Sequence, residues 1–278
     1  MTFNEFAIAQ GLRIRDLSPA DRIRRCPTEA HPRSKNGAYF YDGRKGWVMA
    51  WDGTAEVTWW SDGPQRSPSI AEQRNYRELR RQQRRELAAR HAKSARTARE
   101  RLKASVIGES PYLQYKRVTD RRAYLFGDVT LVPMRDMTTG ALLGLQTIQW
   151  DPVGRTYTKK FWPGMRAKRA VLRIGRGLET VLCEGWATGL SIAEAALQVR
   201  LPVSVLCAFS ASNLIDVAKS CQGRAYVMAD NDTAGIAAAR ATGLPWANSP
   251  VPGEDCNDLH NRAGVFALAR LIQEVRKQ

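Results

Sequence analysis

Two short apolar segments that end in carboxylates constrain the fold of this chain more than any other feature. In the first, VLCEGWATG at 181–189, the apolar run is followed by Glu184. In the second, YVMADNDTAG at 226–235, the apolar run is followed by Asp230 and Asp232. In each segment a glycine follows the acids and a run of helix-forming residues follows the glycine. The pattern predicts apolar strands that alternate with helices, and therefore an α/β unit with a parallel sheet.

The three acids are expected to meet at one edge of that sheet. A further apolar run at 203–209 supplies a strand between them, and the carboxyl ends of parallel strands form the edge where open α/β folds bind ligands. Carboxylates and substrate phosphates are the usual ligands of Mg²⁺. The pattern favours metal-dependent phosphoryl transfer, although Asp-x-Asp and Glu-Gly also recur as turns and helix caps.

The order and context of these motifs resemble the Toprim domain shared by bacterial-type primases, topoisomerases and some nucleases. The resemblance implies a parallel-sheet, Rossmann-like domain at 179–278. It also implies that Glu184, Asp230 and Asp232 are catalytic and hold two Mg²⁺ or Mn²⁺ ions, while a general-base role for Glu184 is the alternative.

The segment PGEDCNDLHNRAG at 252–264 resembles the acidic loop that follows the last core strand of primase Toprim domains. Asp255 falls on the first acidic position of that loop, and Asp258 could replace the second acid, whose place is taken by Asn257. Both would then support the metal ions, and helix capping is the competing interpretation. The chain also departs from the family at Thr188, where an Asp is common.

The region before this domain resembles the basic subdomain of bacterial-type primases. Residues 130–165 predict two strands joined by a Thr-Gly turn and then a further hairpin near 152–154. By that resemblance Arg135 and Lys160, with Lys159 beside it, would contact template or nucleotide phosphates. A solvated hairpin face is the alternative. A mixed α+β subdomain is expected at 109–178.

The amino-terminal region predicts a small β-rich unit at 1–68 that resembles a degenerate zinc ribbon. A structural zinc site needs four Cys or His ligands, and only Cys26 and His31 remain in the segment 25–53. We therefore expect no zinc. Four tryptophans could hold the unit together by burial or stack on bases of single-stranded DNA; they are Trp47, Trp51, Trp59 and Trp60.

A basic helical linker is expected at 69–108. From residue 70 to residue 105 the chain has twelve Lys or Arg and four Glu, a net charge of +8 and half of the formal +16 of the whole chain. Such a helix attracts polyanions, and nucleic acid is the ordinary one. The cations expected to contact DNA phosphates are Arg80, Arg81, Arg84 and Arg85. A solvated linker is the alternative.

Composition excludes other classes of function. No run approaches the roughly twenty apolar residues of a membrane span, and the start of the sequence lacks a secretory pattern. The five cysteines are odd in number and several lie in apolar runs, as expected of reduced thiols in a cytoplasmic protein.

These features together predict a DNA-dependent primase that makes short primers on single-stranded DNA from nucleoside triphosphates. Compact chains of this kind resemble the primases of phages and plasmids. The sequence has no Gly-x-x-x-x-Gly-Lys-Ser/Thr loop, so a replicative helicase or an initiator would act in trans. The alternatives are a Toprim nuclease and a non-catalytic single-stranded-DNA-binding protein derived from a primase.

Overall fold

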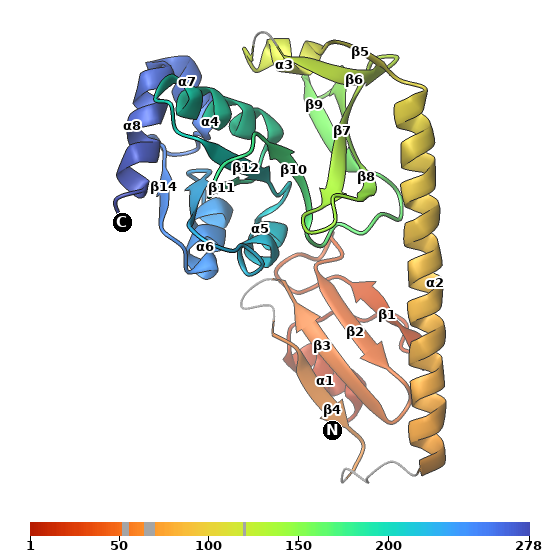
Figure 1. The fold of residues 1–278 in the computed structure, drawn as a ribbon. Coiled ribbons are helices and arrows are strands. Elements are labelled where there is room, and N and C mark those ends of the chain that lie inside the picture. The colour runs from red at the N-terminus through yellow and green to blue at the C-terminus, as the bar shows by residue number, and fades with distance from the viewer. Residues whose placement is uncertain (52–55, 64–69, 119–120) are drawn as a thin grey trace. The chain divides into compact units, whose positions relative to one another are not determined.

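The chain forms two compact units in a computed structural model, Met1–Leu79 and Arg80–Gln278 (Figure 1). The structure describes residues 1–51, 56–63, 70–118 and 121–278. Among the helices within those ranges, none is long and apolar enough to cross a membrane.

The first unit is built on an antiparallel sheet in which the described strands follow the order β1-β2-β3-β4. Its elements are α1 (Phe3–Ala9), β1 (Ala20–Cys26), β2 (Gly37–Tyr41), β3 (Lys45–Ala50) and β4 (Thr58–Ser61). A capping box between Thr2 and Glu5 starts α1. Phe3 from this helix stacks on Tyr41 at 4.7 Å between ring centroids, so the helix seals the core of the sheet.

The tryptophans of this unit divide between core and surface. Trp60 contacts Phe3 and donates a hydrogen bond from Nε1 to the Met1 carbonyl oxygen, so core packing is correct for Trp60. Trp59 lies opposite Trp47 across β3 and β4 and is 70 % exposed, so the same prediction is wrong for Trp59. Trp51 is 41 % exposed and carries the Arg25 guanidinium over its ring.

Cys26 ends β1 as a buried residue of this core. Burial raises the pKa of its thiol to about 11, so it is a neutral core group at physiological pH. His31 lies in the following loop, where its backbone N–H donates to Thr28 Oγ1.

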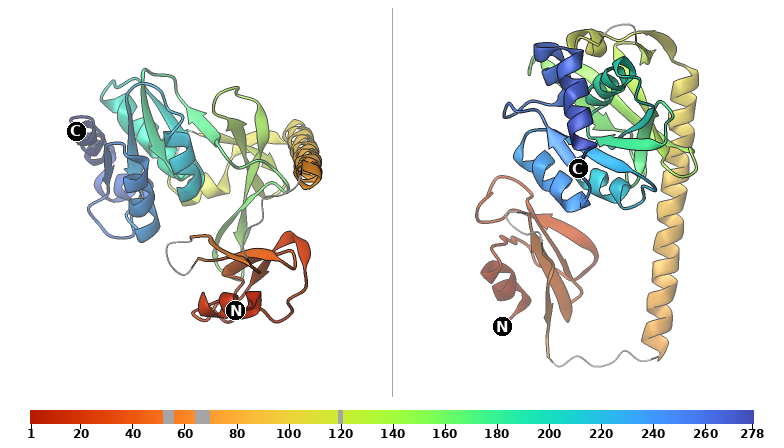
Figure 2. Two further views of the ribbon diagram at one scale, coloured as in Figure 1. Left: turned by 90° about the horizontal axis from the view of Figure 1, so that it is seen from below. Right: turned by 60° about the vertical axis from the view of Figure 1, so that its left-hand side comes forward.

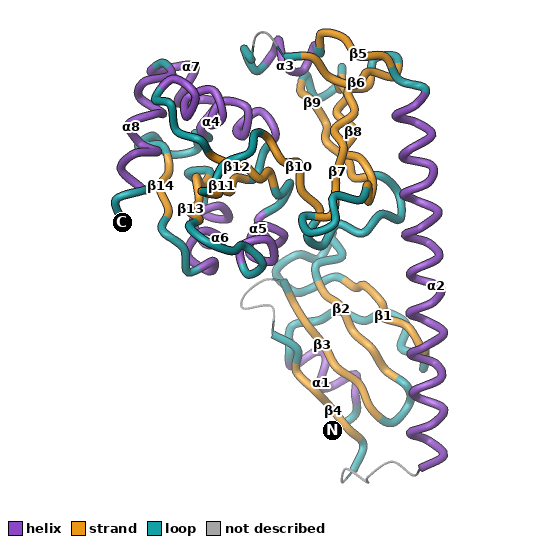
Figure 3. Tube along the Cα trace, in the orientation of Figure 1, coloured by secondary structure: helices purple, strands orange, loops and turns teal. Residues whose placement is uncertain are grey.

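The second unit is an α/β unit whose described strands form one ten-stranded sheet (Figure 3). Its strands are β5 (Val106–Glu109), β6 (Arg122–Phe126), β7 (Val129–Asp136), β8 (Leu142–Asp151), β9 (Thr156–Phe161), β10 (Ala170–Ile174), β11 (Glu179–Cys183), β12 (Val203–Cys207), β13 (Ala225–Ala229) and β14 (Trp246–Asn248). Besides the larger part of α2 (Ile70–Lys103), its helices are α3 (Pro111–Tyr115), α4 (Trp186–Gln198), α5 (Ala211–Ala218), α6 (Thr233–Thr242), α7 (Cys256–Ala263) and α8 (Val265–Val275).

The carboxyl-terminal part of this sheet is parallel and covered on both faces. The strands run in the order β14-β13-β11-β12, with every neighbouring pair parallel. Helices α4, α7 and α8 cover one face, and α5 and α6 cover the other. The predicted α/β fold class is therefore confirmed. It arises because runs such as VSVLC at 203–207 are buried on both sides.

β10 joins this parallel sheet to the antiparallel strands that precede it. It pairs antiparallel with β12 on one side and with β7 on the other, while β8 and β9 extend the sheet from β7. The boundary expected between residues 178 and 179 therefore falls inside one continuous hydrogen-bonded sheet. The hairpins predicted within 130–165 are present as β7, β8 and β9.

The long helix α2 (Ile70–Lys103) matches the predicted basic helix. Within the second unit its last turns cover the face of β7 and β8 that carries Leu131 and Leu145 (Figure 2). Ser94 Oγ donates to the Pro163 carbonyl oxygen at 2.9 Å, and the Trp162 indole donates to Thr97 Oγ1 at 3.0 Å. The other face of β7 and β8 is left for α3 and α4.

Candidate active site

Glu184 and Asp230 lie where two neighbouring parallel strands end. Glu184 directly follows β11 and Asp230 directly follows β13, and the two strands pair in register over residues 180–182 and 225–227. Both carboxylates therefore reach the same edge of the sheet, as the sequence predicts.

Asp232 begins α6 and holds the loop that carries Asp230. Its side chain accepts a hydrogen bond from the Gly235 backbone N–H at 2.7 Å. A Cβ atom at Gly235 would lie 2.4 Å from the Asp230 carbonyl oxygen, so only glycine allows this close approach. The side chain of Asp232 is more exposed than that of Asp230.

A cavity of about 100 Å³ opens at this edge between the parallel and antiparallel parts of the sheet. Glu184, Asp230 and Asp255 contribute carboxylates, and Lys159 contributes a cation from β9. The complete lining is Tyr112, Gln146, Lys159, Glu184, Gly185, Ala187, Thr188, Phe209, Asp230 and Asp255.

The electrostatics of this cavity are unfavourable to its own carboxylates. Burial raises the pKa of the Asp230 carboxyl to about 7, and the negative charges of Asp255 and Glu184 add to the effect. Burial also raises the pKa of Glu184, followed by the charge of Asp232. Lys159 opposes both shifts. An added cation would relieve this repulsion.

The residues present fit a divalent cation. Asp230 Oδ1 is buried and has no hydrogen-bond partner among the described residues. Such an atom is costly unless a ligand satisfies it, and a hard cation takes oxygen ligands of this kind. The carboxylates do not yet converge, because no three described His, Cys, Asp or Glu side chains are grouped closely enough to hold an ion. Binding would therefore require rotation of these side chains.

Asp255 and Asp258 form a capping box at the start of α7. The Asp255 side chain accepts from the backbone N–H groups of Asn257 and Asp258, and Asp258 Oδ2 accepts from the Asp255 N–H. Lys116 Nζ lies 3.8 Å from Asp255 Oδ2 and 3.6 Å from Asp258 Oδ1. The capping interpretation is thus correct for both residues, while Asp255 also faces the cavity.

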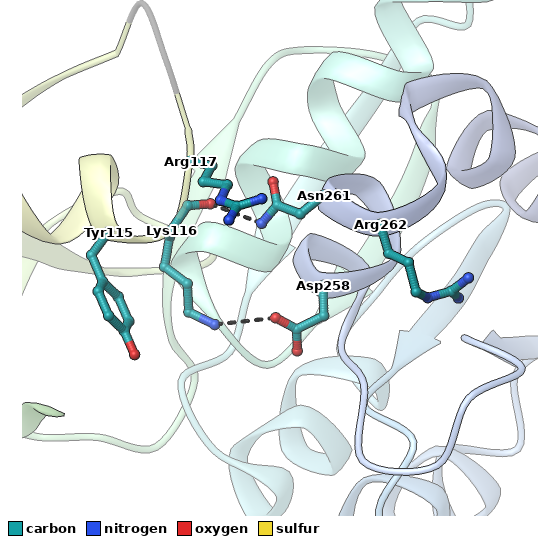
Figure 4. A pocket seen from close by; sticks show the side chains of 6 residues that line it. All are labelled: Tyr115, Lys116, Arg117, Asp258, Asn261 and Arg262. Atoms are coloured by element: carbon teal, nitrogen blue, oxygen red, sulfur yellow. Dashed lines mark hydrogen bonds and ion pairs between the residues drawn. The ribbon is translucent and has the colours of Figure 1, made fainter.

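Asp258 faces a second, more open pocket of about 340 Å³. Figure 4 shows Lys116 extending toward Asp258 while the Asn261 amide donates to the Lys116 carbonyl oxygen. Arg262 also lines this pocket, and its guanidinium makes two hydrogen bonds to Glu254. The structure therefore places Asp258 among cations rather than with Glu184 and Asp230.

The two departures from the family motif have different surroundings. Asn257 is fully buried, and its Nδ2 donates to the Lys116 carbonyl oxygen and to Ser191 Oγ, each at 3.0 Å. It ties α7 to α4 and to the segment after α3. Thr188 is 1 % exposed and lines the cavity with a neutral hydroxyl.

The predicted basic residues separate in the structure. Lys159 pairs with Ile148 across β8 and β9 and lines the cavity, with Nζ 5.3 Å from the centre of the Tyr112 ring. Lys160 pairs with Thr147 and so points to the opposite face of the sheet. Arg135 is exposed and donates from Nη1 to the Gly140 carbonyl oxygen at 3.1 Å. Of these three, the cavity includes only Lys159.

The four arginines expected to contact DNA are exposed on α2 and do not line the cavity. They are Arg80, Arg81, Arg84 and Arg85.

Sequence reasoning missed Gln146, Tyr112 and Lys116. Gln146 occupies an inward position of β8 in line with Gly144 and Ile148, where the alternation of the strand calls for an apolar residue. A polar residue at a buried strand position was the available signal. Tyr112 and Lys116 come from the short α3 region and carry no comparable pattern.

Comparison with known families identifies part of the chain. Residues 179–265 match the family model described as Toprim domain. The resemblance seen in the acid-ended strands is confirmed over those residues. A comparison with curated proteins found no match.

The solved structures that are similar to the chain include the following two. One is bacteriophage T7 lagging-strand DNA polymerase interacting with primase domains of two gp4 subunits bound to an RNA/DNA hybrid and dTTP. The matched chain is 18 % identical with a TM-score of 0.40, over 60 % of this chain and 85 % of that one. The other is the DnaG catalytic core, 20 % identical with a TM-score of 0.37, over 58 % of this chain and 56 % of that one.

Proposed function

We propose that this chain is a DNA-dependent primase that joins nucleoside triphosphates on a single-stranded DNA template, for phage or plasmid replication. The observation that carries the proposal is the unsatisfied Asp230 carboxylate in a cavity that also receives Lys159. A site for nucleotidyl transfer needs a place for metal ions beside a place for phosphates, and this cavity offers both kinds of group.

In this proposal Glu184, Asp230 and Asp232 hold two Mg²⁺ or Mn²⁺ ions, with Asp255 in support. When bound, such ions lower the pKa of an attacking hydroxyl and neutralise charge on the triphosphate and the leaving pyrophosphate. Asp232 also fixes the loop of Asp230 through its hydrogen bond to Gly235.

Lys159 has the role of a phosphate-binding cation. It projects from β9 into the same cavity as Glu184 and Asp230, where its positive charge already favours the ionised form of both acids. A nucleoside triphosphate would contact Lys159 from the antiparallel part of the sheet and the metal ions held at the parallel part.

The template would be held in part by α2. The exposed arginines at 80, 81, 84 and 85 provide a sequence-independent phosphate contact. A helicase or initiator from another chain would deliver the template, since the sequence carries no nucleotide-hydrolysing phosphate loop.

Primer synthesis tests the proposal directly. The protein is incubated with single-stranded template, Mg²⁺ or Mn²⁺ and labelled nucleotides, and the products are sized. Asp230→Asn and Asp232→Asn keep the size of the side chain but remove its charge, so each is expected to reduce synthesis roughly a hundredfold or more. Wild-type synthesis by either variant would refute the site.

Lys159 and Lys160 provide a matched pair, because they are adjacent and point to opposite faces of β9. Lys159→Met is expected to lower synthesis at least tenfold, and Lys160→Met to leave it within about twofold, since a hydrogen bond to a charged group is worth about 1.5–3 kcal/mol and about 1.36 kcal/mol is a tenfold change in rate. Equal effects would contradict the assignment of Lys159.

The two alternatives give different results in the same assay. A Toprim nuclease cleaves DNA without added nucleotides, and a non-catalytic derivative binds DNA but neither synthesises nor binds divalent metal.

A further inference from the structure

The open pocket of about 340 Å³ beside α7 is separate from the cavity of about 100 Å³ that Glu184 and Asp230 line, here called the acidic cavity. Within the described chain the two have no lining residue in common. Pockets that enclose small molecules usually measure roughly 300–1,000 Å³, so the larger pocket falls in that range. Its lining carries three cations and one carboxylate, and consists of Tyr115, Lys116, Arg117, Asp258, Asn261 and Arg262.

Arg117 is the cation of this pocket that a ligand can reach most readily. Its side chain is exposed, and its guanidinium makes no ion pair or hydrogen bond with any residue that the structure describes. By contrast, Lys116 Nζ lies 3.6 Å from Asp258 Oδ1, and the Arg262 guanidinium makes two hydrogen bonds to Glu254. A free guanidinium can bind two oxygens of one phosphate group at once.

The backbone at Arg117 indicates that this side chain serves a ligand. Arg117 follows the last turn of α3 with φ at +55°, a left-handed conformation in which helices usually place Gly or Asn. The turn is fixed from α7, because the side-chain amides of Asn257 and Asn261 donate to the Lys116 carbonyl oxygen at 3.0 and 3.1 Å. Non-glycine residues held in this conformation cluster at ligand-binding and active sites.

Tyr115 adds an aromatic surface to the same pocket. It is 57 % exposed, and its ring centroid lies 5.4 Å from that of Tyr157 and 6.3 Å from that of Trp150. These neighbours hold the ring in place while much of it stays open to solvent. Figure 4 shows Tyr115 and Arg262 at opposite ends of the pocket. Nucleobases stack on tyrosine rings of this kind.

The combination of cations and an exposed ring matches one ligand chemistry. Inorganic phosphate would use the cations but not Tyr115, and an uncharged aromatic molecule would use Tyr115 but not the cations. A nucleotide uses both. Asp258 does not cancel the preference for an anion, because Lys116 faces its Oδ1 and its Oδ2 accepts from the Asp255 N–H.

We propose that this pocket binds a single nucleotide, with its phosphate at Arg117 and its base against Tyr115, outside the acidic cavity. The inference goes beyond the proposed function, because such binding needs neither metal ions nor a template.

Titration of the full chain with AMP in the presence of EDTA tests the inference. Without divalent ions the carboxylates of the acidic cavity repel a phosphate, so binding there is not expected. The wild type should bind AMP more tightly than inorganic phosphate or adenosine. Arg117→Gln should weaken AMP binding at least about tenfold, because a charge-assisted contact is lost. Tyr115→Leu should weaken AMP binding about fivefold or more and leave phosphate binding within about twofold.

Three further variants make the result interpretable. Arg117→Gly suits the left-handed backbone, so it should unfold cooperatively and lose AMP binding as Arg117→Gln does. Arg270→Gln removes an exposed arginine of α8 that does not line the pocket, and it should bind AMP like the wild type. Lys159→Met removes the cation of the acidic cavity and should also bind AMP like the wild type.

The inference is overturned if a cooperatively folded Arg117→Gly variant binds AMP with wild-type affinity. It is also overturned if Lys159→Met loses as much AMP binding as Arg117→Gln, because AMP would then occupy the acidic cavity. A wild-type chain that binds no AMP has the same consequence. The primase proposal survives each of these outcomes, since primer synthesis with added metal tests it separately.

Competition with an oligothymidylate identifies the source of the nucleotide. If the oligonucleotide displaces AMP, the pocket takes a nucleotide of a DNA strand. If it does not, the pocket takes a free nucleotide. Both results support the site.

Discussion

Replacing Asp230 by asparagine is expected to stabilise the protein above neutral pH while it removes metal binding. The folded state raises the pKa of this carboxyl from its ordinary 3.8 to about 7, chiefly by burial. The folded protein therefore binds more protons than the unfolded chain between those values. The contribution of Asp230 to stability is therefore fully present below about pH 4 and is lost as the pH rises to about 7.

The magnitude follows from the same values. A difference of about 3 pH units corresponds to about 4 kcal/mol at 1.36 kcal/mol per unit. Asn removes the charge but leaves a polar group in the same place, so the expected gain at pH 8 is about 2–3 kcal/mol. At pH 4, where the Asp230 carboxyl is protonated in the folded state, the two proteins should be nearly equal.

Urea unfolding in the presence of EDTA at pH 4 and pH 8 measures this difference. Asp232→Asn is the control, because asparagine also caps helices well and the position is exposed. Added Mg²⁺ should stabilise the wild type and not Asp230→Asn. The reasoning would be refuted if Asp230→Asn had a lower free energy of unfolding than the wild type at pH 8. It would also be refuted if the difference between the two proteins were the same at pH 4 and pH 8.

Three further predictions concern the loop, the helix and the amino-terminal unit. Gly235→Ala should lower the free energy of unfolding by at least about 2 kcal/mol and weaken Mn²⁺ binding, because its Cβ would lie 2.4 Å from the Asp230 carbonyl oxygen; unchanged urea unfolding would contradict this. Changing the four α2 arginines at 80, 81, 84 and 85 to Gln should make the slope of log K against log salt concentration for single-stranded DNA binding shallower by about 0.7 for each phosphate that the helix no longer neutralises. Replacing the same arginines by Lys is the control, because it keeps the charge. An unchanged slope in the Gln variant would make α2 a linker. Elemental analysis of the purified protein should find no stoichiometric zinc, and one tightly held zinc per chain would overturn that expectation.

The parallel part of the fold could be predicted because its signals lie within short, continuous segments of the sequence. An apolar run that ends in Glu184 or Asp230 and continues into a helix specifies strand, edge and acid together. Likewise, the long basic helix follows from a run of strong helix formers without Gly or Pro.

What could not be predicted depends on pairing between distant strands. Whether Lys159 or Lys160 faces the cavity is decided by the register of β9 on β8, and a shift by one residue would exchange them. The exposure of Trp59 and the burial of Gln146 are decided in the same way. Alternation reveals two faces of a strand, but the packing of α2, α3 and α4 decides which of these faces lines the cavity.

Because β10 pairs with β12, the stretch of chain that matches the family model is shorter than the stretch that completes the sheet. The Toprim match begins at residue 179, whereas β10 ends at Ile174 and supplies the hydrogen-bonded neighbour on one side of β12. A fragment cut at the start of the match would expose a fully buried strand, β12, as an open edge, a known template for aggregation. The smallest piece that can be expected to stay soluble therefore begins well before the family boundary and brings the antiparallel strands with it.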